Sequence, residues 1–212
     1  MKGTLISVIS GVVAALLLSV TAAAQTQWQE GEHYDLIKPE VRVSKDQVVV
    51  TEFFWYGCGH CYTFEPMLES WAKTLPEGAT LQGSPAMWNE DMKLHAKAFY
   101  AAEALGVYDT MHTVIFKAMH VDRKRLGSDK SIRELFVANG VDGDAFDRAF
   151  DSFGVNSQVR QAESRARAAK ITGTPSLMVN GKYLISARKA GSQSNMLKVA
   201  DHLVEMELAA AR

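Results

Sequence analysis

The chain has 212 residues, of which 47% are hydrophobic and 22% are charged, and only two are cysteines. This length and composition favour one folded domain, with room for an insertion, and argue against wholesale disorder. The net charge of −1 gives no general attraction to nucleic acid or to an anionic membrane. Two cysteines form neither a multi-bridge scaffold nor a four-thiolate metal cage, and a chain this long builds its core without a disulfide. Unless the pair is accidental, its role is therefore chemical.

The first segment has the features of a secretory signal peptide. Lys2 precedes an uncharged, mainly apolar stretch that ends in Ala22-Ala23-Ala24, and the next charged residue is Glu30. The apolar run of roughly 16 residues is shorter than the roughly 20 that a membrane-spanning helix needs. We expect cleavage after Ala24, with an uncleaved anchor as the alternative. Either outcome places the folded part outside the cytoplasm, where disulfides persist.

The sequence that follows predicts strands first and then helices. Residues 48–55 are β-branched and aromatic with little alternation, which is typical of a strand covered on both faces. Residues 62–73 have the pattern of a helix, and 79–84 suit a second strand. Residues 89–170 carry apolar side chains at three- and four-residue spacing, which predicts a block of helices.

Strand patterns return after this block. Residues 176–179 and 182–185 predict a hairpin around Asn180-Gly181, a pair that favours a two-residue type I′ turn. Residues 194–211 predict a final helix. The order strand, helix, strand, helical block, hairpin and helix indicates an α/β fold with helices inserted in its middle.

Cys58-Gly59-His60-Cys61 places two thiols three residues apart where strand gives way to helix. A disulfide across so short a loop is easily broken and reformed, which suits exchange. The helix N-terminus offers unpaired N–H groups and partial positive charge to a thiolate at Cys58, and a protonated His60 would add to this. Gly57 leaves this sulfur uncovered on its strand side. We expect a Cys58 pKa below the free-thiol value of about 8.5, and a less reactive Cys61 one turn deeper.

A zinc site and a structural bridge are the alternative roles for the cysteine pair. A zinc site needs two further ligands, but there is no second cysteine pair, and no close pairing at ligand spacing occurs among His33, His95, His112, His120 and His202. A structural bridge gains little stability here, because closing so short a loop removes little entropy from the unfolded chain. We favour a redox site that uses no metal and no other cofactor.

Two segments far apart in the chain together resemble one known family. Residues 52–65 read Glu-Phe-Phe-Trp-Tyr-Gly-Cys-Gly-His-Cys-Tyr-Thr-Phe-Glu, and residues 173–181 read Gly-Thr-Pro-Ser-Leu-Met-Val-Asn-Gly. The first resembles the active-site segment of the DsbA family, which comprises periplasmic disulfide oxidases of the thioredoxin superfamily. The second is similar to the loop whose cis-proline faces the cysteines in that superfamily. Pro66 is similar to the proline of the active-site helix.

The resemblance implies a thioredoxin-like fold, with a helical domain inserted between the second strand and the cis-proline hairpin. It also implies a periplasmic location. The expected division is a signal peptide at 1-24, a thioredoxin-like domain in two parts at 25-88 and 171-212, and an inserted helical domain at 89-170.

The resemblance also assigns roles to single residues. Cys58 would form the mixed disulfide with substrate and Cys61 would resolve it, while His60 would stabilise the Cys58 thiolate. Thr174 and Pro175 would line the substrate groove, where a cis bond leaves Thr174 free to pair with an extended peptide.

Glu52 is the single charged residue of its apolar strand and is expected beneath the disulfide. Burial would raise its pKa and suit it to exchange a proton with Cys61. The alternative is an edge position with the carboxylate in solvent.

The sequence departs from the best-known members of the family in two places. Gly59 stands where they have proline, which gives Cys-Gly-His-Cys, a motif shared with protein disulfide isomerase domains. The segment Leu81-Gln82-Gly83-Ser84 lacks the lysine that relatives often place beside the buried glutamate. Both departures bear on the redox potential rather than on the class of reaction.

These observations predict a monomeric enzyme that donates its disulfide to reduced, unfolded, newly exported proteins and does not bind nucleic acid. One alternative is an isomerase or reductase that acts on wrongly paired disulfides. Another is a non-enzymatic module that binds peptides as a chaperone. The resemblance implies a quinone-linked membrane protein of the DsbB type as the reoxidising partner.

Overall fold

The computed structural model describes residues 27–44 and 46–211, so the expected signal peptide at 1–24 lies outside the described residues. A five-stranded sheet with the order β1-β5-β4-β2-β3 forms its centre. The β2 strand pairs in parallel with β3 and antiparallel with β4. The strands are β1 at Asp35–Leu36, β2 at Val48–Phe54, β3 at Ala79–Pro85, β4 at Ser176–Val179 and β5 at Tyr183–Ser186.

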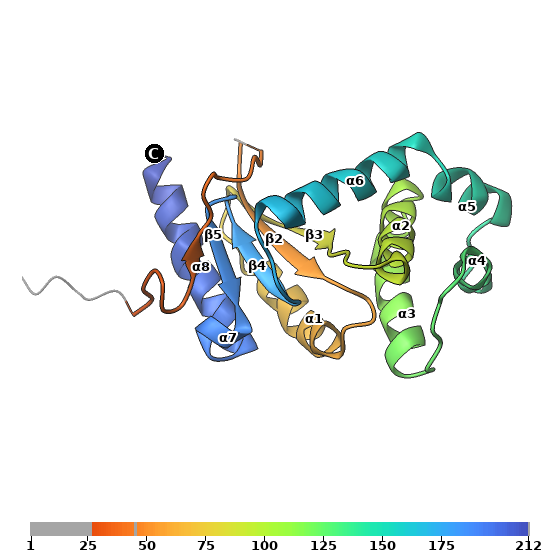
Figure 1. Ribbon diagram of the computed structural model, residues 1–212, viewed down its shortest axis with the longest axis horizontal. Coiled ribbons are helices and arrows are strands. Elements are labelled where there is room, and N and C mark those ends of the chain that lie inside the picture. Colours follow the sequence, from red (N-terminus) through yellow and green to blue (C-terminus); the bar gives the residue numbers. More distant parts are fainter. Residues whose placement is uncertain (1–26, 45, 212) are drawn as a thin grey trace, which may run out of the picture.

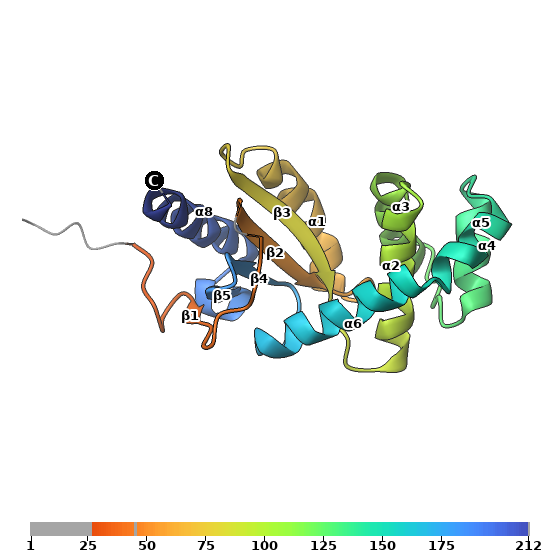
Figure 2. The ribbon, with the colours of Figure 1, turned by 90° about the horizontal axis from the view of Figure 1, so that it is seen from above.

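Helices lie on both faces of the sheet and beyond one of its ends. They are α1 at Gly59–Ala72, α2 at Glu90–Ala104, α3 at Tyr108–His120, α4 at Asp129–Ala138, α5 at Gly143–Phe150, α6 at Phe153–Ala168, α7 at Ala187–Ala190 and α8 at Gln193–Ala210. The helices α1 and α8 pack on one face and α6 on the other, while α2 to α5 form a block at one end (Figures 1 and 2). In the described part of the chain, no helix is both long and apolar enough to cross a membrane.

The β2 strand is buried along its whole length, as its unalternating sequence predicts. Val48 and Val50 belong to the core formed with α1 and α8, and Phe53 belongs to the core on the other face of the sheet. Phe54, the last residue of the strand, packs into the core of the helical block. The carboxyl end of β2 therefore lies where all three cores approach one another.

The inserted helices follow β3, the second of the predicted strands, and precede the β4–β5 hairpin, which confirms the expected fold class. The helix α1 begins at Gly59 rather than at 62, because Cys58 is its N-cap residue and its sulfur accepts the N–H of Cys61. The Asn180-Gly181 turn forms as predicted, because both residues have positive φ and the N–H of Lys182 donates to the Val179 carbonyl at 3.0 Å, but strand pairing resumes one residue later than expected, with Val179 opposite Tyr183. The elements β1 and α7 were not predicted, because two to four residues show no periodic pattern.

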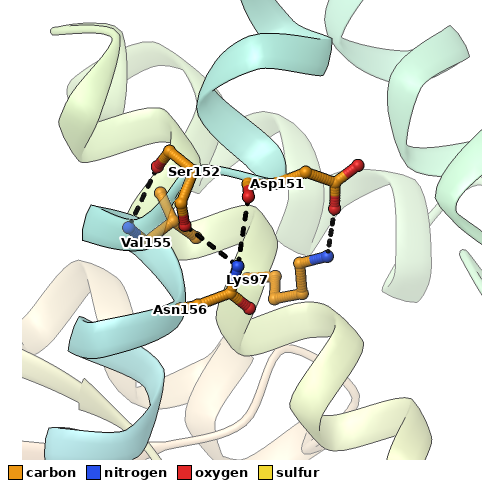
Figure 3. Close-up of polar contacts among 5 residues, drawn as sticks. All are labelled: Lys97, Asp151, Ser152, Val155 and Asn156. Atoms are coloured by element: carbon orange, nitrogen blue, oxygen red, sulfur yellow. Dashed lines mark hydrogen bonds and ion pairs between the residues drawn. The ribbon is translucent and has the colours of Figure 1, made fainter.

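The corner between α5 and α6 shows how the helical block is held together (Figure 3). Ser152 caps α6 by accepting the N–H of Val155 at 3.1 Å. The side-chain amide of Asn156 donates to the carbonyls of Asp151 and Ser152 at 3.3 and 2.9 Å. Lys97 of α2 forms an ion pair with Asp151 at 2.8 Å, so the corner is tied to the helix that packs beneath it.

We expect Ser152→Ala to lower the free energy of unfolding by about 1 kcal/mol, because the N–H of Val155 loses its partner. Urea denaturation of the variant and the parent protein measures this difference. Ser194→Ala is the matched control, because Ser194 is exposed in the first turn of α8, where Ser192 is the cap. Equal losses in the two variants would show that the Ser152 cap adds no stability.

Candidate active site

Cys58 and Cys61 lie where β2 ends and α1 begins, and both are free thiols. Cys58 is half-buried at the N-cap position, whereas Cys61 is fully buried, with 0% of its surface exposed. The sulfur of Cys58 accepts the N–H of Cys61 at 3.3 Å, and its thiol donates to the Thr174 carbonyl at 3.5 Å. The accessible sulfur therefore faces both the helix N-terminus and the Thr174–Pro175 loop.

The two thiols have opposite acidities. The hydrogen bond from the Cys61 thiol is the main cause that lowers the pKa of Cys58 to about 5. Partial burial opposes this effect, while the Thr174 side chain and the N–H groups of Cys61 and His60 support it. Burial, together with the hydrogen bond to Cys58, raises the pKa of Cys61 well above its ordinary value. When one proton leaves the pair, the charge therefore resides on Cys58 and the proton stays on Cys61.

His60 and Gly59 form the exposed first residues of α1. The backbone N–H of His60 contributes to the lowered pKa of Cys58, and its carbonyl accepts a hydrogen bond from Gln193 at 2.7 Å. A stabilising effect of the His60 imidazole stays a prediction. A Cβ atom at Gly59 would meet no other atom within 4 Å, so this position has room for a side chain.

Gly57 lies against the Trp55 ring, a contact that its sequence position did not indicate. A Cβ atom at Gly57 would overlap the indole ring of Trp55, which covers this residue. The Trp55 carbonyl accepts the N–H of Cys58 at 2.9 Å. The Trp55 ring therefore packs against the turn at Gly57, and the expectation that Gly57 leaves the Cys58 sulfur uncovered stays a prediction.

Glu52 lies in the centre of the sheet and is only 3% exposed, so the expected burial is confirmed and the alternative of a solvent-facing edge position is wrong. Burial raises the pKa of Glu52 well above its ordinary value, and the charges of Glu65 and Cys58 raise it further. Gly83 lies opposite on β3, so that neighbour offers no cation. The Oε1 atom of Glu52 has no hydrogen-bond partner among the described residues.

Glu65 is a second, largely buried acid. The sequence analysis did not single it out as a residue of the active site. Its Oε1 lies 3.1 Å from Nε2 of His112 on α3, and its Oε2 has no hydrogen-bond partner within the described part of the chain. The spacing of Cys58, Cys61 and Glu65 by three and four residues places them on one helix face, which is the signal that could have found it.

The Thr174–Pro175 peptide bond is cis, as the resemblance implied. This loop forms one side of a groove of about 410 Å³, whose lining includes His60 on α1, the segment 172–176, the segment 186–188 and Gln193. Thr174, which lines this groove, also contacts Cys58, because its carbonyl accepts the hydrogen bond from the thiol. Within the described residues, no cluster of three or more histidine, cysteine, aspartate or glutamate side chains is arranged to hold a metal ion.

Comparison with known proteins agrees with this geometry. A family model described as a DsbA-like thioredoxin domain matches residues 73–200. The thiol:disulfide interchange protein DsbA of Azotobacter vinelandii is 40% identical over 181 residues, which cover 85% of each chain. That of Pseudomonas syringae pv. tomato is 34% identical over 213 residues, covering 100% of this chain and 99% of its own.

The fold matches as well. The crystal structure of DsbA from Pseudomonas aeruginosa superimposes with a TM-score of 0.83 at 34% identity, covering 87% of this chain and 96% of that one. The chain belongs to the DsbA-like thioredoxin family. As a DsbA-like protein it is a thiol:disulfide oxidoreductase, and Cys58 and Cys61 are its only cysteines.

We expect iodoacetamide to alkylate Cys58 of this DsbA-like protein with a midpoint near pH 5, the pKa of about 5 given above. In Cys61→Ala the midpoint moves toward the free-thiol value of about 8.5, because the main hydrogen bond to the Cys58 sulfur is lost. The rate of alkylation against pH measures both midpoints, and Cys58→Ala controls for labelling elsewhere. The same midpoint with and without the Cys61 thiol would contradict this assignment.

Glu52 makes stability depend on pH in a defined direction. Because its pKa is raised in the folded state, the unfolded chain ionises first, and stability falls as the pH rises above the ordinary glutamate range. We expect Glu52→Gln to be more stable than the parent at pH 7, with the difference vanishing near pH 4. Thermal unfolding at both pH values measures this, with Glu69→Gln, an exposed position on α1, as the control. A Glu52→Gln effect that does not vary with pH would contradict the expectation.

Proposed function

We propose that the protein is a disulfide oxidase, which transfers the Cys58–Cys61 disulfide to reduced, newly exported proteins. The asymmetry of the two thiols carries this proposal: one sulfur is accessible with a lowered pKa, and the other is buried with a raised pKa. A thiol of low pKa is a good leaving group, and its stabilised thiolate favours the reduced form of the pair. The oxidised form is therefore expected to give its disulfide away.

The exchange begins when a substrate thiolate attacks the sulfur of Cys58. The Cys58–Cys61 bond breaks, a mixed disulfide forms, and Cys61 leaves as a buried thiolate that needs a proton. Glu52 holds such a proton, because burial and the neighbouring charges raise its pKa. Its charge interacts with both cysteines, which supports the proposal that it gives the proton to Cys61.

A second substrate thiolate then attacks the substrate sulfur of the mixed disulfide. Cys58 leaves as a thiolate, which the Cys61 thiol stabilises most, with support from the N–H groups of Cys61 and His60. Two substrate thiols have lost two electrons and become a disulfide, and the Cys58–Cys61 pair has gained those electrons. The exchange needs no cofactor.

The substrate groove is proposed to run along the Thr174–Pro175 loop. Support comes from the groove of about 410 Å³ at this loop and from the hydrogen bond that joins Cys58 to the Thr174 carbonyl. An extended peptide that lies along the loop would bring its own cysteine to the sulfur of Cys58.

Family membership supports the cellular context. We propose that residues 1–24 are removed as a signal peptide and that the monomeric protein works in the periplasm, where a quinone-linked membrane protein of the DsbB type reoxidises it. We also propose that 25–88 and 171–212 form the thioredoxin-like domain and that 89–170 form the inserted helical domain. The described strands all lie outside 89–170, which supports this division.

Oxidised protein mixed with a reduced, unfolded substrate protein should lose its disulfide and form one disulfide per chain in the substrate. Counting free thiols on both proteins after acid quenching measures this transfer. Cys58→Ala should abolish it, because no disulfide then exists to donate. Exported proteins that reach full oxidation in cells carrying Cys58→Ala would contradict the oxidase proposal and favour a peptide-binding chaperone.

The redox equilibrium with glutathione separates an oxidase from a reductase. We expect a potential well above that of thioredoxin, which is about −270 mV. A potential near the thioredoxin value would contradict the oxidase and favour a reductase that acts on wrongly paired disulfides.

A further inference from the structure

Three histidines of α2 and α3 form hydrogen bonds with the two residues that precede the active-site turn. Nδ1 of His95 accepts the indole N–H of Trp55 at 2.9 Å. Nδ1 of His112 lies 2.8 Å from the hydroxyl of Tyr56. Nε2 of His120 donates to the Tyr56 carbonyl at 2.8 Å. The inserted helices thus reach this segment through three separate imidazole rings.

Two of these rings are buried and are bonded on both sides. The Nε2 atom of His95 donates to the carbonyl of Leu126, in the loop after α3, at 3.2 Å. The Nε2 atom of His112 donates to the Glu65 carboxylate at 3.1 Å. The two histidines are 2% and 3% exposed, so their orientation is set by protein groups rather than by bulk water.

The segment that these rings hold determines where Cys58 lies. Trp55 and Tyr56 connect the end of β2 to the turn before α1. The Trp55 carbonyl accepts the N–H of Cys58 at 2.9 Å, and the Trp55 ring covers Gly57. A displacement of this segment would move the Cys58 sulfur relative to the N–H groups at the start of α1.

We infer that His95, His112 and His120 are positioning residues for disulfide exchange, and that through them the inserted helical block sets the oxidising strength of the Cys58–Cys61 disulfide. The inference rests on the proposed function, because it takes Cys58 as the reactive sulfur. The three side chains bind Trp55 and Tyr56 rather than a sulfur, so they position the reacting group and take no direct part in the exchange.

The physical link is the geometry of the hydrogen bonds to the thiolate, from the Cys61 thiol first and from the N–H groups of Cys61 and His60 as well. Hydrogen bonds weaken steeply with distance and misalignment, and reacting groups need supporting side chains that are themselves held. If the segment loosens, the Cys61 thiol and these N–H groups stabilise the Cys58 thiolate less. The reduced form then becomes less stable, and the disulfide becomes a weaker oxidant.

Substituting a histidine by asparagine or by glutamine tests separately the hydrogen bonds made by its two ring nitrogens. An asparagine amide lies near the position of Nδ1, and a glutamine amide lies near that of Nε2. At His95 and His112, asparagine therefore keeps the bond to the active-site segment, whereas glutamine keeps only the bond on the far side. At His120 the order is reversed, because Nε2 makes the bond to the segment.

We expect His95→Gln, His112→Gln and His120→Asn to raise the pKa of Cys58 by about one unit, which is about a tenfold loss in the equilibrium constant for oxidising glutathione. The counterparts His95→Asn, His112→Asn and His120→Gln should stay within about twofold of the parent. The pH profile of iodoacetamide alkylation and the equilibrium with glutathione measure both quantities, with circular dichroism to establish that each variant is folded.

Ile132→Ala controls for a general loss of stability. Ile132 is buried in the helical block, on α4, and makes none of the contacts described above. The inference would be overturned if, at each of the three histidines, the asparagine and glutamine variants had the same Cys58 pKa and the same equilibrium constant with glutathione. A shift of the same size in Ile132→Ala would also overturn it. A parent protein whose Cys58 titrates near the free-thiol value of about 8.5 would instead overturn the proposed function, whatever the variants show.

Discussion

The N-terminus of α1 has to hold the sulfur of Cys58 in one place, and the rest of the active site depends on that constraint. The sulfur is itself the cap of the helix, because it accepts the N–H of Cys61. It stays there because β2 is buried in the centre of the sheet and α1 packs on one face of that sheet. A thiolate in a fixed cradle of N–H groups is more stable than one on a mobile loop, since no free energy is spent in arranging the donors.

Two buried acids, Glu52 and Glu65, contribute to the electrostatic balance of the site. Glu52 and Glu65 lie close enough for the charge of Glu65 to raise the pKa of Glu52, and the Cys58 thiolate acts on Glu52 in the same direction. Interacting groups of like charge do not ionise together. The negative charge therefore resides on Cys58, where the Cys61 thiol and nearby N–H groups stabilise it. Glu52 and the buried thiol of Cys61 keep their protons.

Much of this arrangement was predictable from local patterns. The unalternating run of β2, the periodic apolar positions of 89–170 and the Asn180-Gly181 turn each reflect short-range backbone and burial preferences, and the corresponding elements form. The start of α1 differs from its predicted position because a cysteine sulfur acts as its cap, which no propensity scale anticipates. The Trp55 ring against Gly57 was not predicted either, because a contact between a side chain and a glycine two residues away leaves no mark in the apolar pattern.

The sequence by itself determined the reactive pair, its place at a strand-to-helix junction, and the cis-proline loop. Each of these features depends on a short run of contiguous residues. Only the tertiary structure decided the environment of the pair. The Thr174 carbonyl reaches Cys58 from more than a hundred residues away. His95, His112 and His120, which have no close pairing at ligand spacing in the sequence, converge on Trp55 and Tyr56 because α2 and α3 pack against the end of β2. Which side chains meet at the active site depends on how elements distant in the sequence pack together. The spacing of residues along the chain does not predict these contacts.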